Sequence, residues 1–167
     1  MGVGLGGFWL GGFWSQSGDG VATNPTPTIT ATVSPTPVTS LPPGNYDYQR
    51  LLTGSCLAEF PGAWELTYQV AACSAPHAAQ VVRAGQVPGF TATEFPGEAA
   101  VQSAVLPLCS APGVIDTNVA QTNPNVVVTF AYPVTAAQWR ATTGAYVCFA
   151  SNLDGAPLTG SLVPPVG

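Results

Sequence analysis

Residues 73–77 read Cys-Ser-Ala-Pro-His and hold the only histidine of the chain, a cysteine, and a proline that stiffens the link between them. Apolar runs lie on both sides, at residues 66–72 and 79–84. In the first run apolar and polar side chains alternate, which is the pattern of a half-buried β-strand. The second run predicts another strand. Pro76 separates the two, so that they can pair as a hairpin.

Four cysteines are scattered along the chain: Cys56, Cys73, Cys109 and Cys148. No pair has the CxxC spacing, and a single histidine cannot complete the usual zinc patterns. An even number of scattered cysteines in a domain of about this size is typical of two disulfides, which form in an oxidising compartment. The alternative is four buried free thiols in a cytosolic protein.

The chain carries little charge. Only 7% of its 167 residues are charged, and three arginines, no lysine and eight acids give a net charge of −5. Nucleic acids and anionic lipids are both bound through basic surfaces, so the composition argues against both partners. Low charge together with many Thr, Ser, Gly and Pro residues fits a secreted or envelope protein better than a cytosolic enzyme.

Residues 1–14 are apolar, uncharged and rich in glycine. They are shorter than the roughly 20 residues that span a membrane, and they lack the positive start and cleavage site of a secretory signal. We expect the outer half of a transmembrane helix whose first part lies upstream, with the two Phe-Trp pairs at the membrane interface. The alternative is a short, weakly attached or disordered tail.

Residues 15–44 are rich in Pro and Thr, and no charge lies between Asp19 and Asp47. Such a segment cannot build a packed core and favours extended polyproline conformations. We expect a disordered linker, open to O-glycosylation, that serves as a stalk of ~3.1 Å per residue. Plain disorder without a spacer role is the alternative. The order of apolar start, linker and cysteines predicts a single-pass membrane protein with its domain on the extracytoplasmic side.

The folded part is expected at residues 45–162, followed by a tail at 163–167, and about 120 residues can bury a real core. Besides the two strands above, Gly54 to Leu57 looks like a short strand. Residues 126–132 and 146–150 predict further strands because they are β-branched or aromatic.

Helices are expected in two places. Residues 95–98 read Phe-Pro-Gly-Glu and open a helix with apolar side chains at helical spacing, which Pro107 should kink or end. Thr135 to Gln138 matches a capping box, so a short helix should carry Trp139 inward. The predicted fold class is α+β. It is a small domain held by disulfides, with an antiparallel sheet of about three to five strands packed on one face by a main helix, roughly Gly97 to Leu106.

Several of these short motifs occur together in one family. The folded part resembles the septum formation family of actinobacterial membrane-anchored extracytoplasmic domains. The resemblance implies a transmembrane helix, a low-complexity linker and an extracytoplasmic domain connected with cell division or the cell envelope, and it implies no established reaction. The matching residues are Gly54-Ser55-Cys56, Cys73-Ser74-x-Pro76-His77-x-x-Gln80-Val81, Phe95-Pro96-Gly97-Glu98, Cys109, Trp139, Tyr146-Val147-Cys148 and Gly160-Ser161-Leu162.

Two positions depart from the family pattern. This chain has Ser55 before the first cysteine and Gln80 three residues after His77, where the family commonly has acids. A mechanism that combines the histidine with two carboxylates therefore has little support here.

Four cysteines allow three pairings. We predict Cys56–Cys73, which would join the start of the domain to the His77 turn, and Cys109–Cys148, which would tie the helix end to the last strand.

His77 is the first candidate for a functional side chain. A catalytic histidine needs a nucleophile to activate, and the nearby candidates are Ser55 and Ser74, without a G-x-S-x-G elbow. The structural interpretation is that His77 bonds a backbone carbonyl beside the disulfide and fixes the turn. Contact with a ligand is a second interpretation, and catalysis a third.

The acids offer a second candidate, because a pair of them could hydrolyse a cell-wall glycan if a cleft held them at the required separation. A solvated acidic surface is the commoner outcome. The aromatic residues Trp64, Tyr46 and Tyr48 could line a groove for a peptide or glycan, whereas Trp139 is expected in the core. No metal site and no cofactor are predicted. The acids concerned are Glu59, Glu65, Glu94, Glu98 and Asp116.

Two classes of function follow. The first is a non-catalytic, membrane-anchored interaction domain that binds an envelope or division protein, or cell-wall glycan or peptide. Its contacts would come from His77, Trp64, Tyr46 and Tyr48. The alternative is a cell-wall hydrolase or transferase that uses His77 or an acidic pair.

Overall fold

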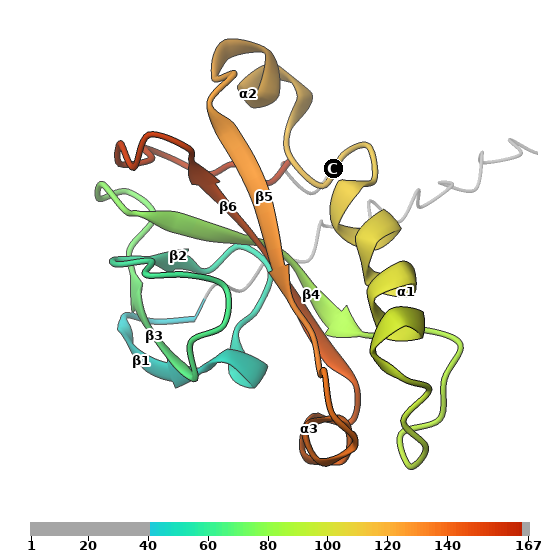
Figure 1. Cartoon of the computed structure of the whole chain (residues 1–167). Coiled ribbons are helices and arrows are strands. Elements are labelled where there is room, and N and C mark those ends of the chain that lie inside the picture. The colour runs from blue at the N-terminus through green and yellow to red at the C-terminus, as the bar shows by residue number, and fades with distance from the viewer. Residues whose placement is uncertain (1–40, 165–167) are drawn as a thin grey trace, which may run out of the picture. The chain divides into compact units, whose positions relative to one another are not determined.

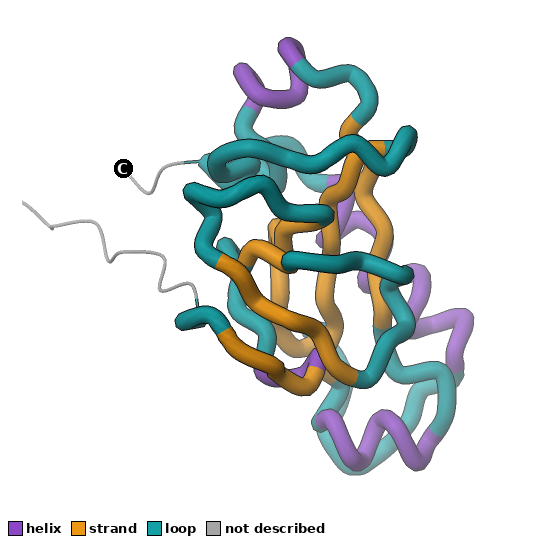
Figure 2. The backbone as a smooth tube through the Cα atoms, turned by 90° about the vertical axis from the view of Figure 1, so that its left-hand side faces the viewer, coloured by secondary structure: helices purple, strands orange, loops and turns teal. Residues whose placement is uncertain are grey.

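The computed structural model describes residues 41–164, which form an α+β domain. Its centre is a six-stranded antiparallel sheet with the strand order β1-β3-β2-β4-β6-β5 (Figure 1 and Figure 2). The class is as predicted, and the sheet has six strands. The elements are β1 (Gly44–Asp47), η1 (Tyr48–Arg50), β2 (Cys56–Leu57), β3 (Thr67–Ala71), β4 (Ala79–Gln86), α1 (Glu98–Ser110), α2 (Thr117–Thr122), β5 (Val126–Ala131), α3 (Ala136–Thr142) and β6 (Ala145–Asn152).

Several predictions concern residues outside the described part. These are the anchor at 1–14, the linker up to residue 40 and the end of the tail at 165–167. Among residues 41–164 no helix is long and apolar enough to cross a membrane. Ordered structure begins shortly before Asn45, because Leu41 packs against the core and β1 starts at Gly44.

The two strands around His77 do not pair with each other, so the hairpin prediction is wrong. Strand β2 lies between them, with Cys56 opposite Ala71 of β3 on one side and opposite Gln80 of β4 on the other. Backbone hydrogen bonds extend this arrangement beyond the strand. The Ala58 N–H donates to the Gln69 carbonyl of β3, and the Ser55 carbonyl accepts from the Val81 N–H of β4. The buried two-residue strand β2 thus supplies hydrogen-bond partners to the facing edges of both β3 and β4. In a direct hairpin these two edges would have paired with each other.

The sheet buries side chains on both faces. Along β6, Cys148 and Ala150 belong to one apolar cluster, while Val147 and Phe149 belong to another, as alternate residues of a strand must. Helix α1 packs on the first face, next to β4 and β5 (Figure 1). On the second face, side chains of the sheet pack against residues of the loops that flank β2, among them Leu51, Phe60 and Ala63. This agrees with the expectation of a main helix on one face.

The helix was predicted to run roughly from Gly97 to Leu106. The observed helix α1 continues past Pro107 and ends at Ser110. Proline removes one backbone donor, and other groups hold the last turn. The Ser110 hydroxyl donates to the Leu106 carbonyl at 2.8 Å, and Arg83 Nη1 donates to the Leu108 carbonyl at 3.1 Å. The Cys109–Cys148 disulfide also fixes this turn to β6.

Both predicted disulfides are present. Cys56 is bonded to Cys73 and Cys109 to Cys148, with Cα–Cα distances of 5.3 and 5.6 Å. The capped helix is confirmed as well. Thr135 Oγ1 accepts from the Gln138 backbone N–H at 3.2 Å, and Trp139 is buried.

Three elements were not predicted: β1, the short 3-10 helix η1 and α2. Strand β1 carries too short a pattern to be recognised. Helix α2 has no apolar periodicity and begins where the Asp116 carboxylate accepts from two backbone N–H groups.

Candidate functional site

His77 lies inside the domain, with 1% of its surface exposed. Its Nδ1 is 2.9 Å from the Ala75 carbonyl oxygen, which can only accept, so the proton sits on Nδ1. Its backbone exchanges two hydrogen bonds with Leu158, at 3.1 and 2.7 Å. Nε2 is buried and has no partner among the described residues. The structural interpretation is therefore confirmed, and the burial argues against direct contact between His77 and a ligand.

Gln80 is buried beside the Cys56–Cys73 disulfide, and its amide group makes several hydrogen bonds. Its Nε2 donates to the Gly54 carbonyl at 3.1 Å and to Ser161 Oγ at 3.2 Å. Its Oε1 accepts from the backbone N–H of Leu162. The amide thus joins three segments that are distant in the sequence. The Gln80 side chain is therefore occupied in holding the fold together.

The candidate nucleophiles do not form a pair with His77. Ser55 is fully buried, and neither its Oγ nor His77 Nε2 has a partner among the described residues, so the two are not bonded to each other. Ser74 is exposed on the turn. The arrangement needed for a histidine-activated serine, with the two groups in hydrogen-bond contact, is not formed in this structure.

The acidic candidates are spread over the surface. The four glutamates are exposed, and Asp116 is occupied as the cap of α2. Among residues 41–164, no three His, Cys, Asp or Glu side chains gather as they would around a metal ion. The distribution fits a solvated acidic surface.

Two of the predicted aromatic residues come together, and one lies apart. Tyr48 and Trp64 border the same small pocket. Tyr46 is in β1, where it is half-buried and faces Tyr68 across the sheet. Its ring covers Gly44, so that a side chain at this glycine would meet it at 3.4 Å. Tyr46 therefore belongs to the packing of β1.

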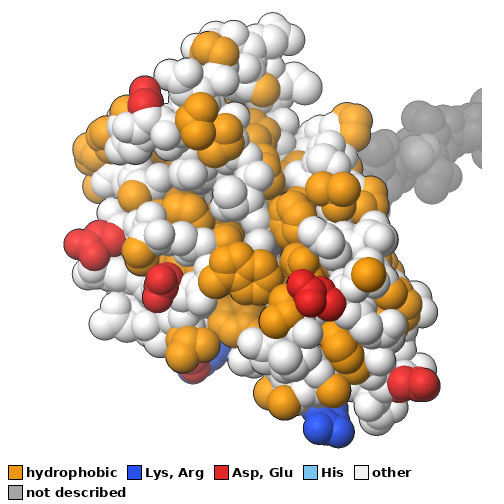
Figure 3. Space-filling view, viewed as in Figure 1, with side chains coloured by type: hydrophobic (Ala, Val, Ile, Leu, Met, Phe, Trp, Pro, Cys, Tyr) orange, Lys and Arg blue, Asp and Glu red, His pale blue; other side chains and the backbone are white. Residues whose placement is uncertain are grey.

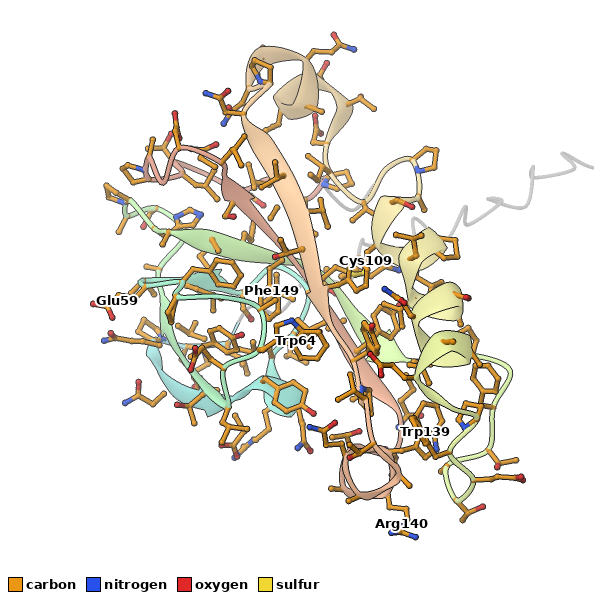
Figure 4. All side chains as sticks on the ribbon, in the orientation of Figure 1. Glu59, Trp64, Cys109, Trp139, Arg140 and Phe149 are labelled. Atoms are coloured by element: carbon orange, nitrogen blue, oxygen red, sulfur yellow. A yellow bond between two sulfur atoms is a disulfide. The ribbon has the colours of Figure 1, made fainter. Side chains whose placement is uncertain are left out.

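Trp64 is 57% exposed and Leu66 is 76% exposed. The Trp64 ring stands edge-on to Tyr132, with ring centroids 5.3 Å apart and an interplanar angle of 70°. We call Tyr48, Trp64, Leu66 and Tyr132 the aromatic patch. Figure 4 shows Trp64 at the centre of the domain face that includes the patch. A pocket of about 50 Å³ opens there, lined by Tyr48, Ala63, Trp64, Glu65, Leu66, Ala131, Tyr132 and Gln138.

The loop that carries Trp64 is fixed to the sheet at several points. The Tyr68 hydroxyl donates to the Gly62 carbonyl at 2.8 Å and accepts from the Glu65 backbone N–H at 3.2 Å. The Leu66 carbonyl accepts from the Tyr48 backbone N–H at 3.0 Å. Phe60, from the same loop, packs on the core ring of Phe149. Trp64 is thus exposed on a loop whose backbone is anchored on both sides.

The patch has an acidic environment. Glu65 lines the pocket, and burial together with the negative charge of Glu98 raises the pKa of Tyr132. Burial also raises the pKa of Tyr48, which the Thr142 hydroxyl partly offsets. Figure 3 shows hydrophobic side chains gathered at the centre of this face with an acidic group beside them.

A larger pocket lies elsewhere in the domain. It measures about 440 Å³ and is lined by parts of η1, β4, α3 and β6, including Arg50, Gln86 and Tyr146. Across it, Gln86 Nε2 donates to Thr143 Oγ1 at 2.9 Å. None of the candidate catalytic or binding residues named from the sequence lines it. Its walls come from four elements with no common motif, so the sequence carries no signal for it.

Tyr132, Ala63 and Gln138 were also missed as parts of the site. Tyr132 ends the predicted strand 126–132, and its aromatic side chain is the one signal that could have suggested it.

Comparison of the chain with protein-family models, with curated proteins and with solved structures gives no match.

Proposed function

We propose that residues 41–164 form a non-catalytic interaction domain that binds an envelope partner through the aromatic patch. The observation that carries the proposal is Trp64, a large aromatic side chain that is 57% exposed on an anchored loop. Exposed apolar groups of this kind mark interaction surfaces, and tryptophan is enriched at the residues that dominate binding energy. Because the loop is already ordered, binding would cost little additional conformational entropy.

The setting outside the cytoplasm is part of the same proposal. Two disulfides are the arrangement expected in an oxidising compartment. The apolar residues 1–14 and the Pro/Thr-rich linker support a single-pass anchor. A connection with septum or envelope formation rests on the sequence resemblance of residues 54–162.

A binding role suits the chemistry of the site better than catalysis does. The histidine is held by the Ala75 carbonyl and buried, and the Gln80 amide is used in packing. A hydrolase or transferase would need an accessible base or acid positioned against its substrate. The side chains that are accessible at the aromatic patch are suited to contact and recognition.

The test compares Trp64→Ala with Leu153→Ala in cells that make the full chain. Leu153 is 77% exposed and does not line the pocket at Trp64, so its substitution controls for the loss of an exposed apolar group. Loss of a central tryptophan typically costs about 2 kcal/mol or more, which is ~30-fold in affinity. We expect Trp64→Ala to lose partner co-purification or septal localisation by about this factor, with Leu153→Ala unchanged.

Two results would contradict the proposal. Equal retention of the partner by Trp64→Ala and the unchanged chain would remove the patch from binding. Release of products from cell-wall material by the purified chain, reduced about 10²-fold or more by His77→Ala or by loss of one acid, would instead establish an enzyme.

A further inference from the structure

The pocket at Trp64 has the size of one side chain. Its volume of about 50 Å³ is well below the roughly 300–1,000 Å³ of pockets that enclose small-molecule ligands. Beside it stand Trp64 and Leu66, both more than half exposed. A protein segment can insert one side chain into such a pocket while it covers the neighbouring apolar surface.

The charge around the pocket is negative. Glu65 is one of the lining residues, and burial together with the negative charge of Glu98 raises the pKa of Tyr132, whose ring contacts Trp64. No arginine is among the residues that line the pocket. Figure 4 shows Arg140 at the lower edge of the view, pointing away from Trp64. A ligand group that enters here meets aromatic rings and carboxylates.

We propose that the aromatic patch binds a Lys or Arg side chain of a partner protein segment, over the ring of Trp64 and beside the carboxylates of Glu65 and Glu98. Aromatic faces attract cations, and Arg also stacks flat on a ring. The carboxylates add complementary charge that favours the correct partner. Adjacent apolar residues of the segment would cover Leu66. This inference rests on the proposed function, because it names the chemistry of the partner that the patch would bind.

The test uses the full chain, labelled with ¹⁵N, and two short peptides that differ in one group. One is acetyl-Leu-Arg-Leu-amide. The other has citrulline, which matches Arg in shape but carries no charge. The readout is the indole N–H signal of Trp64, assigned by its absence from Trp64→Ala. We expect the Arg peptide to shift this signal with a Kd at least about fivefold lower than that of the citrulline peptide, with the difference shrinking at ~1 M salt.

A charge variant tests the carboxylates directly. The double substitution Glu65→Gln, Glu98→Gln should bring the two peptides to within about twofold of each other, since the charge term is removed. Glu59→Gln is the matched control. Glu59 is also exposed, lies at the left edge of the view in Figure 4, away from Trp64, and does not line the pocket. This control should leave the preference for the Arg peptide intact.

Three outcomes would overturn the inference: equal affinity for the two peptides, no shift of the Trp64 signal by millimolar Arg peptide, or an unchanged preference in the double variant. Each of these would leave the proposed docking role intact if Trp64→Ala still loses the cellular partner. Loss of that docking role would instead appear as full retention of the partner by Trp64→Ala.

Discussion

Gln80 illustrates at the residue scale how a polar side chain can serve the fold. A carboxylate can only accept hydrogen bonds, whereas an amide also donates. Here Nε2 donates to the Gly54 carbonyl and Oε1 accepts from the Leu162 backbone. These partners are 26 and 82 positions away in the sequence. The sequence alone therefore could not predict what the Gln80 amide would bind.

Substitution of Gln80 by Leu should destabilise the domain by about 2–4 kcal/mol, because the Gly54 carbonyl and the Leu162 N–H would be buried without partners. The measurement is the free energy of unfolding from urea titration of the full chain. Gln69→Leu is the matched control, since Gln69 is exposed on neighbouring β3. We expect that variant to stay within about 0.5 kcal/mol of the unchanged chain. Equal effects of the two substitutions would contradict the role assigned to Gln80.

Tyr68 carries a prediction about alkaline pH. Burial raises the pKa of its hydroxyl from 10.0 to about 12, partly offset by the hydrogen bond from Glu65. The folded state therefore holds this proton more tightly than the unfolded chain does. The corresponding stability is fully present below pH 10.0 and is lost as the pH rises through about 12.

Tyr68→Phe removes this ionisation. Its free energy of unfolding should fall less steeply between pH 10.0 and about 12 than that of the unchanged chain. At neutral pH the variant should be the less stable of the two, because the hydrogen bond to the Gly62 carbonyl is lost. Parallel curves over the alkaline range would show that Tyr68 is not the group responsible.

At the scale of elements, alternation of apolar and polar residues located β3, an apolar run located β4, and β-branched or aromatic residues located β5 and β6. The prediction for β3 was wrong at its first residue, because Leu66 lies before the strand and is exposed. Such patterns do not determine the order of the strands in the sheet. The hairpin prediction paired the nearest strands, whereas the short β2 enters between them from earlier in the chain. Two residues cannot display a period, so their place depends on tertiary pairing.

The two disulfides connect elements over different chain lengths, and this difference predicts unequal contributions to stability. The separations are 17 residues for Cys56–Cys73 and 39 for Cys109–Cys148. In the chain-entropy model these loops correspond to about 3 and 4 kcal/mol. Removing each pair by double Cys→Ala substitution should lower the unfolding free energy in that order. A larger loss for Cys56–Cys73 would show that packing around the His77 turn outweighs loop entropy.

On the scale of the whole molecule, the fold class and both disulfides could be predicted from the sequence, while the site could be predicted only in part. Trp64 and Tyr48 were candidates because aromatic residues could line a groove for a peptide or glycan. Tyr132 and Gln138 join them because the end of β5 and the start of α3 lie beside the Trp64 loop. His77 attracted attention as the only histidine, yet the fold uses it inside. That a residue type is rare in the sequence therefore did not indicate that its side chain is accessible to solvent.

The central claim is that the aromatic patch is the docking surface, and photo-crosslinking tests it most directly. Leu66, exposed beside Trp64, is replaced by a photo-reactive phenylalanine analogue in the full chain, and Leu153 is replaced in a control. After irradiation of intact cells, position 66 should give a discrete adduct that Trp64→Ala reduces by about tenfold or more, while position 153 gives none. An adduct from position 153 alone, or one from position 66 that is unaffected by Trp64→Ala, would contradict the account.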